Sequence, residues 1–458
     1  MISKPWKTVG KIIAVLLALP IILVLVFFLI NSIDRAPSPT AIEFQQAWDN
    51  RKAVVPAENG YIYFFGFDAA TDELPTAVGE KRIQLSKDLV KGIASNKDLF
   101  RSEYRMEEAF IPEVKRTFDQ CANINITCTE TIAKNRARII EWSQAENIAS
   151  QRYAQLIAHP HWLELAPMDV NLPIPNLSLV TKVQRLAFIH EFAALEQGNA
   201  NRFVALLDAD LRFWRTVLRD TDMLIIKVMA ANAIRNNFLW TNYFLLSLDP
   251  SLRTAATPLT VQQPFTEEEL SMQRSFIGEW KLTSKAMGST KSNDFDKLSE
   301  QLAYQFLFKK QDSINRSAER FKQLIDAQAV TTPVFEAGFA QQDKPTPTPT
   351  TDANQKSELW HPNNAFSYYL TNPYNPVGKI LLAVATPAYD NYTIRVRDLE
   401  AFRSGLLASI EHMNNTPETH LKHTSPYKTK PFVIDQEKRS ITVNGLSQGS
   451  QAQLVYAF

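Results

Sequence analysis

The sequence predicts a mainly helical body behind one N-terminal transmembrane helix, with helical-hairpin elements and a small β component. Leu, Ala, Glu, Gln, Lys and Arg are abundant, and only 13 glycines occur in 458 residues, which favours helices over a large sheet. Apolar side chains recur three and four positions apart over most of the chain, as they do in helices with one buried face. With 45% hydrophobic residues, the chain can bury one large core or two smaller ones.

The first element is an apolar segment, residues 12–30, in which 19 consecutive residues are uncharged. A helix of this length covers about 28 Å, close to the hydrocarbon thickness of a bilayer. Pro20 lies in its middle, and lipid-embedded helices tolerate proline better than soluble helices do. A cleaved signal peptide is the alternative, but the following FLINSIDRAPSP offers no good cleavage site between small residues. We therefore predict an uncleaved transmembrane anchor.

Charged residues on the two sides of this segment predict its orientation. Three lysines precede it in residues 1–11, whereas Asp34 and Arg35 cancel each other after it. By the positive-inside rule, the N-terminal tail stays in the cytoplasm and the body is exported. We expect a single-pass protein of a cell inner membrane, with the lipid bilayer as the partner of residues 12–30 and the body in the periplasm.

Helices are the expected elements of the exported body. The first covers residues 42–52, and the longer ones that follow are expected at 76–95, 129–158, 178–197, 200–220, 222–248, 265–286, 295–329 and 395–413. Segment 222–248 is strongly apolar but contains Lys227 and Arg235, so we predict a core helix and not a second membrane span. The Pro-rich segment between 159 and 178 is expected to cross the helices as an extended strap.

An aromatic stretch, GYIYFFGF at residues 60–67, places five rings in seven positions. The rings belong to Tyr61, Tyr63, Phe64, Phe65 and Phe67. We interpret the stretch as a buried strand near 61–67, because the helices provide a core for the rings to enter. A ligand platform and a wedge into a membrane are the alternatives, and both would leave several rings exposed.

The only two cysteines, Cys121 and Cys128, lie in the sequence CANINITC. A disulfide between them would close an eight-residue ring, which an oxidising periplasm allows. A metal site would need two more ligands nearby, and the neighbouring sequence FDQCANINITCTET contains no histidine. We therefore expect a disulfide.

Residues 341–357, QQDKPTPTPTTDANQKS, cannot bury a core and are expected to be a linker or a mobile loop. This segment separates a mainly helical body, residues 36–340, from a C-terminal unit, residues 358–458. The C-terminal unit contains the last predicted helix and two apolar runs around the charged turn DQEKR, which predict a β-hairpin. With so little core of its own, this unit is expected to dock on the body.

Charge and motifs exclude several classes of function. The 49 Lys and Arg residues balance 48 Asp and Glu residues, and no basic stripe with interleaved aromatics occurs, so we expect no nucleic-acid partner. The sequence contains no phosphate-binding glycine loop, no dinucleotide-binding fingerprint and no cluster of metal ligands. We therefore expect no cofactor.

Four stretches carry a resemblance. They are GYIYFFGFDAATDELPTAVG, DLRFWRTVLRDTDMLIIKVMA, NPVGKILLAVATPAYDNYTIRVRDLEAF and SPYKTKPFVID. Together they resemble a group of uncharacterised single-pass inner-membrane proteins of Gram-negative bacteria with a large periplasmic body. The resemblance covers most of the exported body and supports the compartment, but it implies no activity and no catalytic residues.

Acidic residues and histidines near the aromatic stretch and the strap are weak candidate sites. Asp68 and Asp72 could hold a divalent cation or act as acid and base. We favour the structural interpretation, in which Asp68 ends the strand in a turn and Asp72 caps the next helix. His159 and His161 in the sequence HPHW could share a metal, but no third ligand is adjacent, and a helix stopped by proline explains the sequence equally well.

His190 and Asp210 form the last candidate pair. Each lies on the apolar stripe of its predicted helix, and folding about Gly198 would let the two side chains face each other. Such a pair can serve catalysis, but it can equally be a buried polar contact that fixes helix register. No serine or cysteine nucleophile with a recognisable motif accompanies it, so we favour the structural role.

The function that fits these observations is a non-enzymatic, membrane-anchored periplasmic protein that binds or scaffolds another envelope protein. The alternative is a periplasmic hydrolase with a dispersed Asp/His site. An enzyme should bring several candidate side chains into one pocket, whereas a scaffold should present a groove without them.

Overall fold

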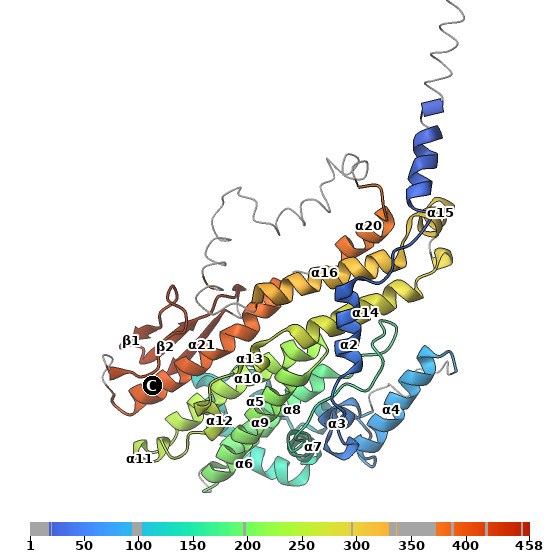
Figure 1. Ribbon diagram of the computed structural model, residues 1–458. Coiled ribbons are helices and arrows are strands. Elements are labelled where there is room, and N and C mark those ends of the chain that lie inside the picture. Colours follow the sequence, from blue (N-terminus) through green and yellow to red (C-terminus); the bar gives the residue numbers. More distant parts are fainter. Residues whose placement is uncertain are drawn as a thin grey trace, which may run out of the picture. The chain divides into compact units, whose positions relative to one another are not determined.

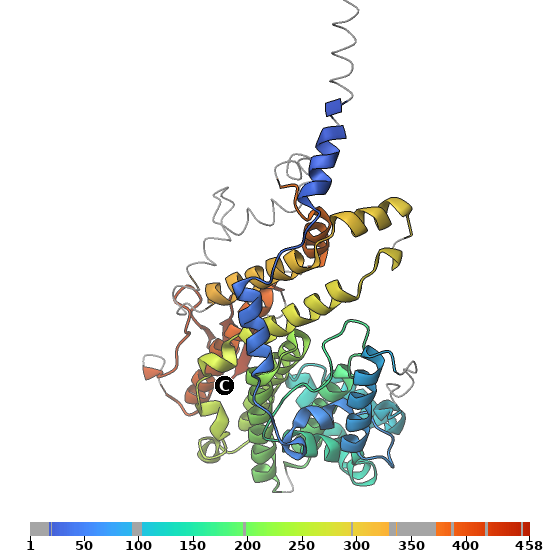
Figure 2. The same ribbon diagram turned by 45° about the vertical axis from the view of Figure 1, so that its right-hand side comes forward.

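A computed structural model describes most of the chain (Figures 1 and 2). The described residues are 18–19, 21–93, 103–195, 198–294, 296–328, 336, 372–385, 389–416, 420–449 and 452–458. Most of them are helical, and the strands among them form one small antiparallel sheet near the C-terminus. The predicted fold class, mainly helical with a small β component, is confirmed.

The chain divides into two compact units. Unit 1 is drawn from Met1–Asn50, Trp280–Gln323 and Pro345–Pro387, and unit 2 from Arg51–Glu279, Leu324–Lys344 and Ala388–Phe458. Unit 1 contains α2 (Pro39–Asp49), α15 (Leu298–Leu307) and α20 (Pro376–Ala385). Helices α14 (Gln273–Ser289) and α16 (Lys310–Gln328) have residues in both units.

Unit 2 holds the remaining long helices and the sheet. Its helices of nine or more residues are α4 (Pro75–Val90), α5 (Pro112–Gln120), α6 (Ile126–Ala145), α7 (Ile148–Ile157), α8 (Leu177–Ala193), α9 (Ala200–Asp220), α10 (Leu224–Leu246) and α21 (Asp390–Met413). Short helices include α3 (Gly60–Phe65), α11 (Pro250–Arg253), α12 (Leu259–Gln262) and α13 (Glu267–Leu270). The strands are β1 (Val433–Asp435), β2 (Ser440–Asn444) and β3 (Gln453–Ala457).

Helix α10 is the centre of the unit 2 core, because it packs against α9, α8 and α21. Phe203 of α9 lies against Phe244 of α10 with ring centroids 5.0 Å apart, and both rings are fully buried. A helix that is covered on several sides is apolar all round, which explains the strongly apolar sequence of α10. Lys227 is buried in it, and its Nζ donates to the Leu218 carbonyl oxygen at 2.5 Å.

The aromatic stretch is helical, so the predicted strand near 61–67 is wrong. Asn59 begins helix α3, since its side chain accepts a hydrogen bond from the Tyr61 amide at 3.2 Å. An apolar run this short gives no periodicity that separates a buried helix from a buried strand. Gly79 of α4 lets the two backbones meet, because a Cβ there would lie 1.9 Å from the Ile62 carbonyl oxygen.

The predicted burial of the aromatic stretch is confirmed. Tyr61 and Phe64 are 1% and 2% exposed, and Trp162 packs on both with ring centroids 5.6 and 5.2 Å away. Trp162 belongs to the Pro-rich segment, so that segment crosses α3. With all five rings buried, neither a ligand platform nor a membrane wedge fits the stretch.

Three of the predicted helices are each divided into two helices. The expected helix 129–158 is broken between α6 and α7, the expected helix 265–286 between α13 and α14, and the expected helix 295–329 between α15 and α16. The first break lies at Glu146 and Asn147, whose backbones leave the helical region (Glu146 φ −129°, ψ 73°). Apolar spacing alone does not reveal such breaks when the stripe continues on both sides of them.

The C-terminal β-hairpin is confirmed, and a third strand extends it. The sheet order is β1-β2-β3, with both pairs antiparallel. Its buried face packs on α21, where Gly405 leaves room for Val443, since a Cβ there would lie 2.1 Å from the valine methyl. Strand β3 is an edge strand by the sheet order, and its residues alternate between exposed and buried, as they do in a strand with one face on the core.

The predicted disulfide is present between Cys121 and Cys128, with the two sulfur atoms 2.10 Å apart. It joins the end of α5 to the beginning of α6 and so closes the loop 122–127. The predicted linker, residues 341–357, lies outside the described residues.

The predicted anchor is described only from its middle onward. Residues 21–30 are helical, and their apolar side chains are largely exposed, with Leu29 at 72%. Within the part of the chain that the structure covers, no helix reaches the length and apolar character needed to cross a membrane. Residues 1–17 and Pro20 lie outside that part, so the span over 12–30 stays a prediction.

Candidate functional site

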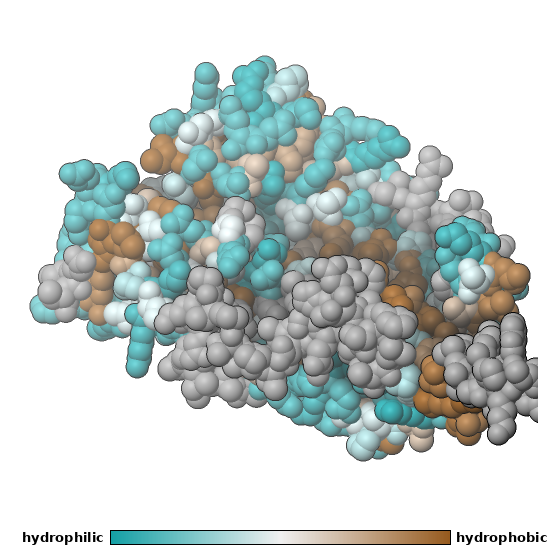
Figure 3. Space-filling view, turned by 90° about the horizontal axis from the view of Figure 1, so that it is seen from above, coloured by the Kyte–Doolittle hydropathy of each residue, from teal (hydrophilic) through white to brown (hydrophobic). Residues whose placement is uncertain are grey.

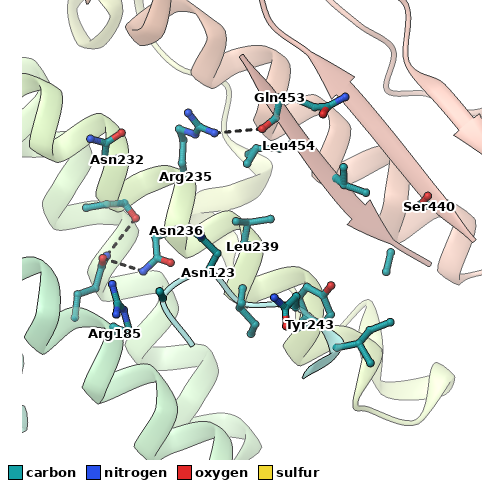
Figure 4. A pocket seen from close by; sticks show the side chains of 18 of the residues that line it. Asn123, Arg185, Asn232, Arg235, Asn236, Leu239, Tyr243, Ser440, Gln453 and Leu454 are labelled. Carbon is teal, nitrogen blue, oxygen red and sulfur yellow. Dashed lines mark hydrogen bonds between the residues drawn. The ribbon is translucent and has the colours of Figure 1, made fainter. Parts of the chain in front are cut away.

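Unit 2 contains a pocket of about 700 Å³. Four segments form its walls: the disulfide loop, α8, α10 and the C-terminal sheet (Figure 4). Its lining residues are Ala122, Asn123, Ile124, Asn125, Ile126, Thr181, Gln184, Arg185, Asn232, Ala233, Arg235, Asn236, Leu239, Tyr243, Lys438, Ser440, Gln453, Leu454, Val455 and Ala457. We call it the sheet-edge pocket, because strand β3 forms one wall.

The disulfide loop is held in place at both ends. Asn125 caps α6, accepting a hydrogen bond from the Cys128 amide at 2.9 Å. Ile124 is 4% exposed, whereas Asn123 beside it is exposed and lines the pocket. The loop therefore presents polar groups to the pocket from a fixed backbone.

The charged side chains that line the sheet-edge pocket among the described residues are all cations: Arg185, Arg235 and Lys438. Arg185 and Arg235 are half-buried, and burial lowers the pKa of each guanidinium from its usual value. Both remain cations at neutral pH, because an arginine pKa starts above 12. Removing part of their hydration strengthens their attraction for an anion that enters.

Arg185 is oriented by aromatic contact and has no close carboxylate. Its guanidinium lies 4.7 Å from the centroid of the Phe118 ring. Asp119 raises the Arg185 pKa from a distance, and no carboxylate in the described residues is within ion-pair range of this guanidinium. A planar guanidinium of this kind binds a carboxylate or phosphate through two parallel hydrogen bonds.

Arg235 is directed toward the sheet. Its guanidinium lies over the Phe402 ring, 4.9 Å from the centroid, and donates to the Gln453 carbonyl oxygen at 3.3 Å (Figure 4). This contact places a positive charge directly beside the outer edge of β3.

Amide side chains line the wall between the two arginines. Gln184 donates to the Ala233 carbonyl oxygen at 3.2 Å and accepts from Asn236 at 3.1 Å, so these groups are fixed (Figure 4). The side chains of Asn123, Asn232 and Tyr243 make no hydrogen bond within the described residues, so their polar groups can meet a ligand.

Strand β3 presents an open edge to the pocket at Val455. The register with β2 turns the backbone groups of Gln453, Val455 and Ala457 away from β2. Asn242 occupies one end of this edge, because its amide bonds both the N–H and the carbonyl oxygen of Ala457, at 3.0 and 2.9 Å. At the other end, Arg235 donates a hydrogen bond to the Gln453 carbonyl oxygen. The N–H and C=O of Val455, which lies between Gln453 and Ala457, have no partner in the described structure.

The predicted partner of Asp210 was His190, and the structure gives Asp210 different partners. Tyr153 donates a short hydrogen bond to it, and Gln184 and Asn237 donate at 3.0 and 2.8 Å. Burial raises the pKa of Asp210 to about 6. Asp210 is thus a fully buried polar contact that fixes α7, α8, α9 and α10, and through Gln184 it supports the pocket wall.

His190 lines a second, smaller pocket of about 340 Å³ with Glu191 and Arg202. Its Nδ1 lies 3.9 Å from the Glu191 carboxylate, and Arg202 pairs with that carboxylate at 2.8 Å. Burial, and then the nearby Arg202 charge, lower the pKa of His190 to about 4, so it is neutral at pH 7.

Asp68 and Asp72 do not form a site together. Asp68 is buried in an ion pair with Arg82, which also donates to the Phe65 carbonyl oxygen at 2.9 Å. Asp72 is exposed, and it does not cap α4, because the N-cap residue there is Leu74.

The two strap histidines have separate partners. His159 Nδ1 lies 2.9 Å from the Gln155 carbonyl oxygen, and His161 Nε2 lies 3.5 Å from the Glu58 carboxylate. Among the residues that the structure describes, no three His, Cys, Asp or Glu side chains are grouped as metal ligands. The candidate acidic residues and histidines predicted from sequence therefore do not come together in one site.

The lining of the sheet-edge pocket was not predicted from sequence. Arg185, Arg235 and Val455 come from three distant segments, and none belongs to a local motif. The available signal was partial: arginines and asparagines interrupt the apolar pattern of two core helices.

Comparison with protein families, with curated proteins and with solved structures gives no match for this chain. The site is therefore assigned from its geometry and chemistry alone.

Proposed function

We propose that this protein is a membrane-anchored, non-enzymatic binding protein of the bacterial envelope. In this proposal the sheet-edge pocket takes an extended, acidic peptide segment of another envelope protein. One observation carries the proposal: the open N–H and C=O of Val455 lie on a strand edge in a pocket whose charged lining is cationic.

An extended peptide can use both features at once. Its backbone would pair with Val455, adding one more strand segment to the edge of β3, a common mode of peptide recognition. A carboxylate two residues further along points to the same face as the first side chain and would reach a guanidinium. Asn242 and Arg235 close the two ends of the open edge, so the peptide backbone can pair over a short length only.

The compartment rests on sequence evidence. The uncharged segment 12–30, the three lysines before it and the disulfide between Cys121 and Cys128 support an exported body held at the inner membrane. The resemblance to single-pass inner-membrane proteins of Gram-negative bacteria points the same way.

The alternative, a periplasmic hydrolase, requires candidate acid and base residues in one pocket. Of the candidate site residues predicted from sequence, only His190 lines either of the two pockets described here. Asp210 is fully buried behind the wall of the sheet-edge pocket. The geometry therefore favours binding over hydrolysis.

Fluorescence anisotropy of a labelled peptide tests the proposal with the full chain in detergent. The probe is an extended peptide of alternating valine and threonine that contains two aspartates, compared with the same peptide carrying asparagine at those positions. We expect the acidic peptide to bind at least tenfold more tightly, because a hydrogen-bonded charge pair contributes about 1.5–3 kcal/mol.

Three variants sharpen the test. Arg185→Gln should weaken binding of the acidic peptide about tenfold, and Arg138→Gln, on an exposed arginine of α6, should not. Val455→Pro should abolish pairing without breaking a hydrogen bond to β2, because the Val455 N–H points outward. Equal affinity for the two peptides, or unchanged affinity in Arg185→Gln, would contradict the proposal.

A further inference from the structure

Helix α15 of unit 1 exposes an apolar stripe. Leu298, Leu302 and Phe306 are four residues apart and are 69%, 45% and 47% exposed. Residues at this spacing share one face of a helix. Helix α20 packs against α15 and exposes Val384 to 76%. Large apolar side chains gathered on one surface usually mark contact with a partner or a membrane.

This surface is next to the end of the predicted anchor, within the same unit. The ring of Phe28, inside segment 12–30, lies 5.6 Å from the ring of Phe306, edge to face. At the right-hand side of the view from above, where residues 21–30 and α15 lie in Figure 1, apolar side chains reach the surface (Figure 3).

The chain is fixed where it leaves the anchor. Asn31 accepts from the Asn375 amide at 2.7 Å and donates to the Pro373 carbonyl oxygen at 2.8 Å. Asp34 then accepts from the Gln311 amide at 2.7 Å, at the start of α16. These hydrogen bonds hold residues 31–34 on unit 1, so we expect the end of the anchor and the exposed face of α15 to meet the same surface.

Two lysines follow the apolar stripe in the sequence, and apolar residues followed by cations are expected where a protein meets the membrane boundary. Lys309 and Lys310 come directly after the aromatic end of α15, in the sequence FLFKK. Lysine stems can cover apolar surface while their ammonium groups reach lipid phosphates. Aromatic and cationic residues are typical of this boundary.

We propose that the exposed faces of α15 and α20 lie in the headgroup region of the bilayer that anchors the chain, with lipid as their partner. The inference rests on the proposed membrane anchor. It makes unit 1 a membrane-facing unit.

Quenching by brominated lipids tests this surface with the full chain in bilayer nanodiscs. Single cysteines replace Val24 in the anchor, Leu302 on α15 or Ile42 on α2, and each is labelled with a small fluorophore. Ile42 is the matched control, since it belongs to the same unit and is 46% exposed, compared with 45% for Leu302. We expect brominated lipid to reduce the signal at positions 24 and 302 by at least half and to leave position 42 nearly unchanged.

The outcomes separate this inference from the proposed anchor. Quenching at position 24 but not at 302 would overturn the lipid contact and leave the anchor in place. No quenching at position 24 would remove the anchor, and the inference with it. If position 302 is protected from lipid and an unlabelled cysteine there forms a disulfide with the same position of another copy, the surface serves self-association and the inference is wrong. Equal quenching at positions 302 and 42 would mean unspecific adsorption and would also contradict it.

Discussion

Acid should weaken the folded state through His190, and replacing this residue should remove the effect. His190 lies on α8 with 18% of its side chain exposed, and burial is the main reason why its pKa falls from 6.5 to about 4. The folded chain therefore binds a proton at His190 only at a lower pH than the unfolded chain does. His190→Gln keeps a neutral polar side chain of similar size and cannot titrate.

The expected size follows from the two pKa values. A shift of 2.5 pKa units corresponds to about 3 kcal/mol of unfolding free energy, as an order of magnitude. Above pH 6.5 the imidazole is neutral in both states, and its contribution is fully present. As the pH falls from 6.5 to about 4, the unfolded chain gains the proton first, so stability is lost across this window and levels off below it.

Urea denaturation of the wild type and of His190→Gln at intervals between pH 4 and pH 8 measures this contribution. Burial raises the pKa of Glu164, Glu279 and Asp210, which titrate with the opposite sign, but they are common to both proteins and cancel in the difference. His420→Gln, on an exposed histidine, serves as the control. A wild-type minus His190→Gln difference that stays constant with pH would refute the reasoning.

Three further changes probe the fold. Phe65→Ala should cost about 3–5 kcal/mol in urea denaturation, because it empties a buried ring site; a variant as stable as the wild type would contradict the buried helix α3. Asp68→Asn should cost about 3–5 kcal/mol, since it removes the carboxylate charge that pairs with the buried Arg82 cation, and an unchanged melting temperature would argue against that ion pair. Replacing Cys121 and Cys128 by serine should cost about 2–3 kcal/mol, and if the wild type loses no stability in reductant, the disulfide is absent.

Elements with long apolar stripes were predictable from sequence, because many residues repeat the same spacing. Helix α9 was predicted with the bounds that the structure gives it, and α10 within two residues at each end. The aromatic stretch failed for the opposite reason: α3 has six residues, and aromatic side chains fit a buried strand as well as a buried helix.

Burial was predicted better than pairing. Asp210 was correctly placed on a buried stripe, but its partners, Tyr153, Gln184 and Asn237, come from three other helices whose rotation the sequence does not specify. The sheet-edge pocket shows the same limit, since Arg185 and Val455 are brought together only by the packing of α8, α10 and the sheet. Long-range packing decides such contacts, and single-sequence periodicity carries no information on it.

Hydrogen exchange at the edge of β3 tests the central claim most directly. The amides of Leu454 and Tyr456 point toward β2, and Asn242 protects Ala457, so in the free protein Gln453 and Val455 should exchange fastest within the strand. Adding the acidic peptide to the full chain in detergent should slow exchange at Val455 at least tenfold, while the asparagine peptide should not. Unchanged exchange at Val455 with a saturating acidic peptide would contradict the proposed pairing.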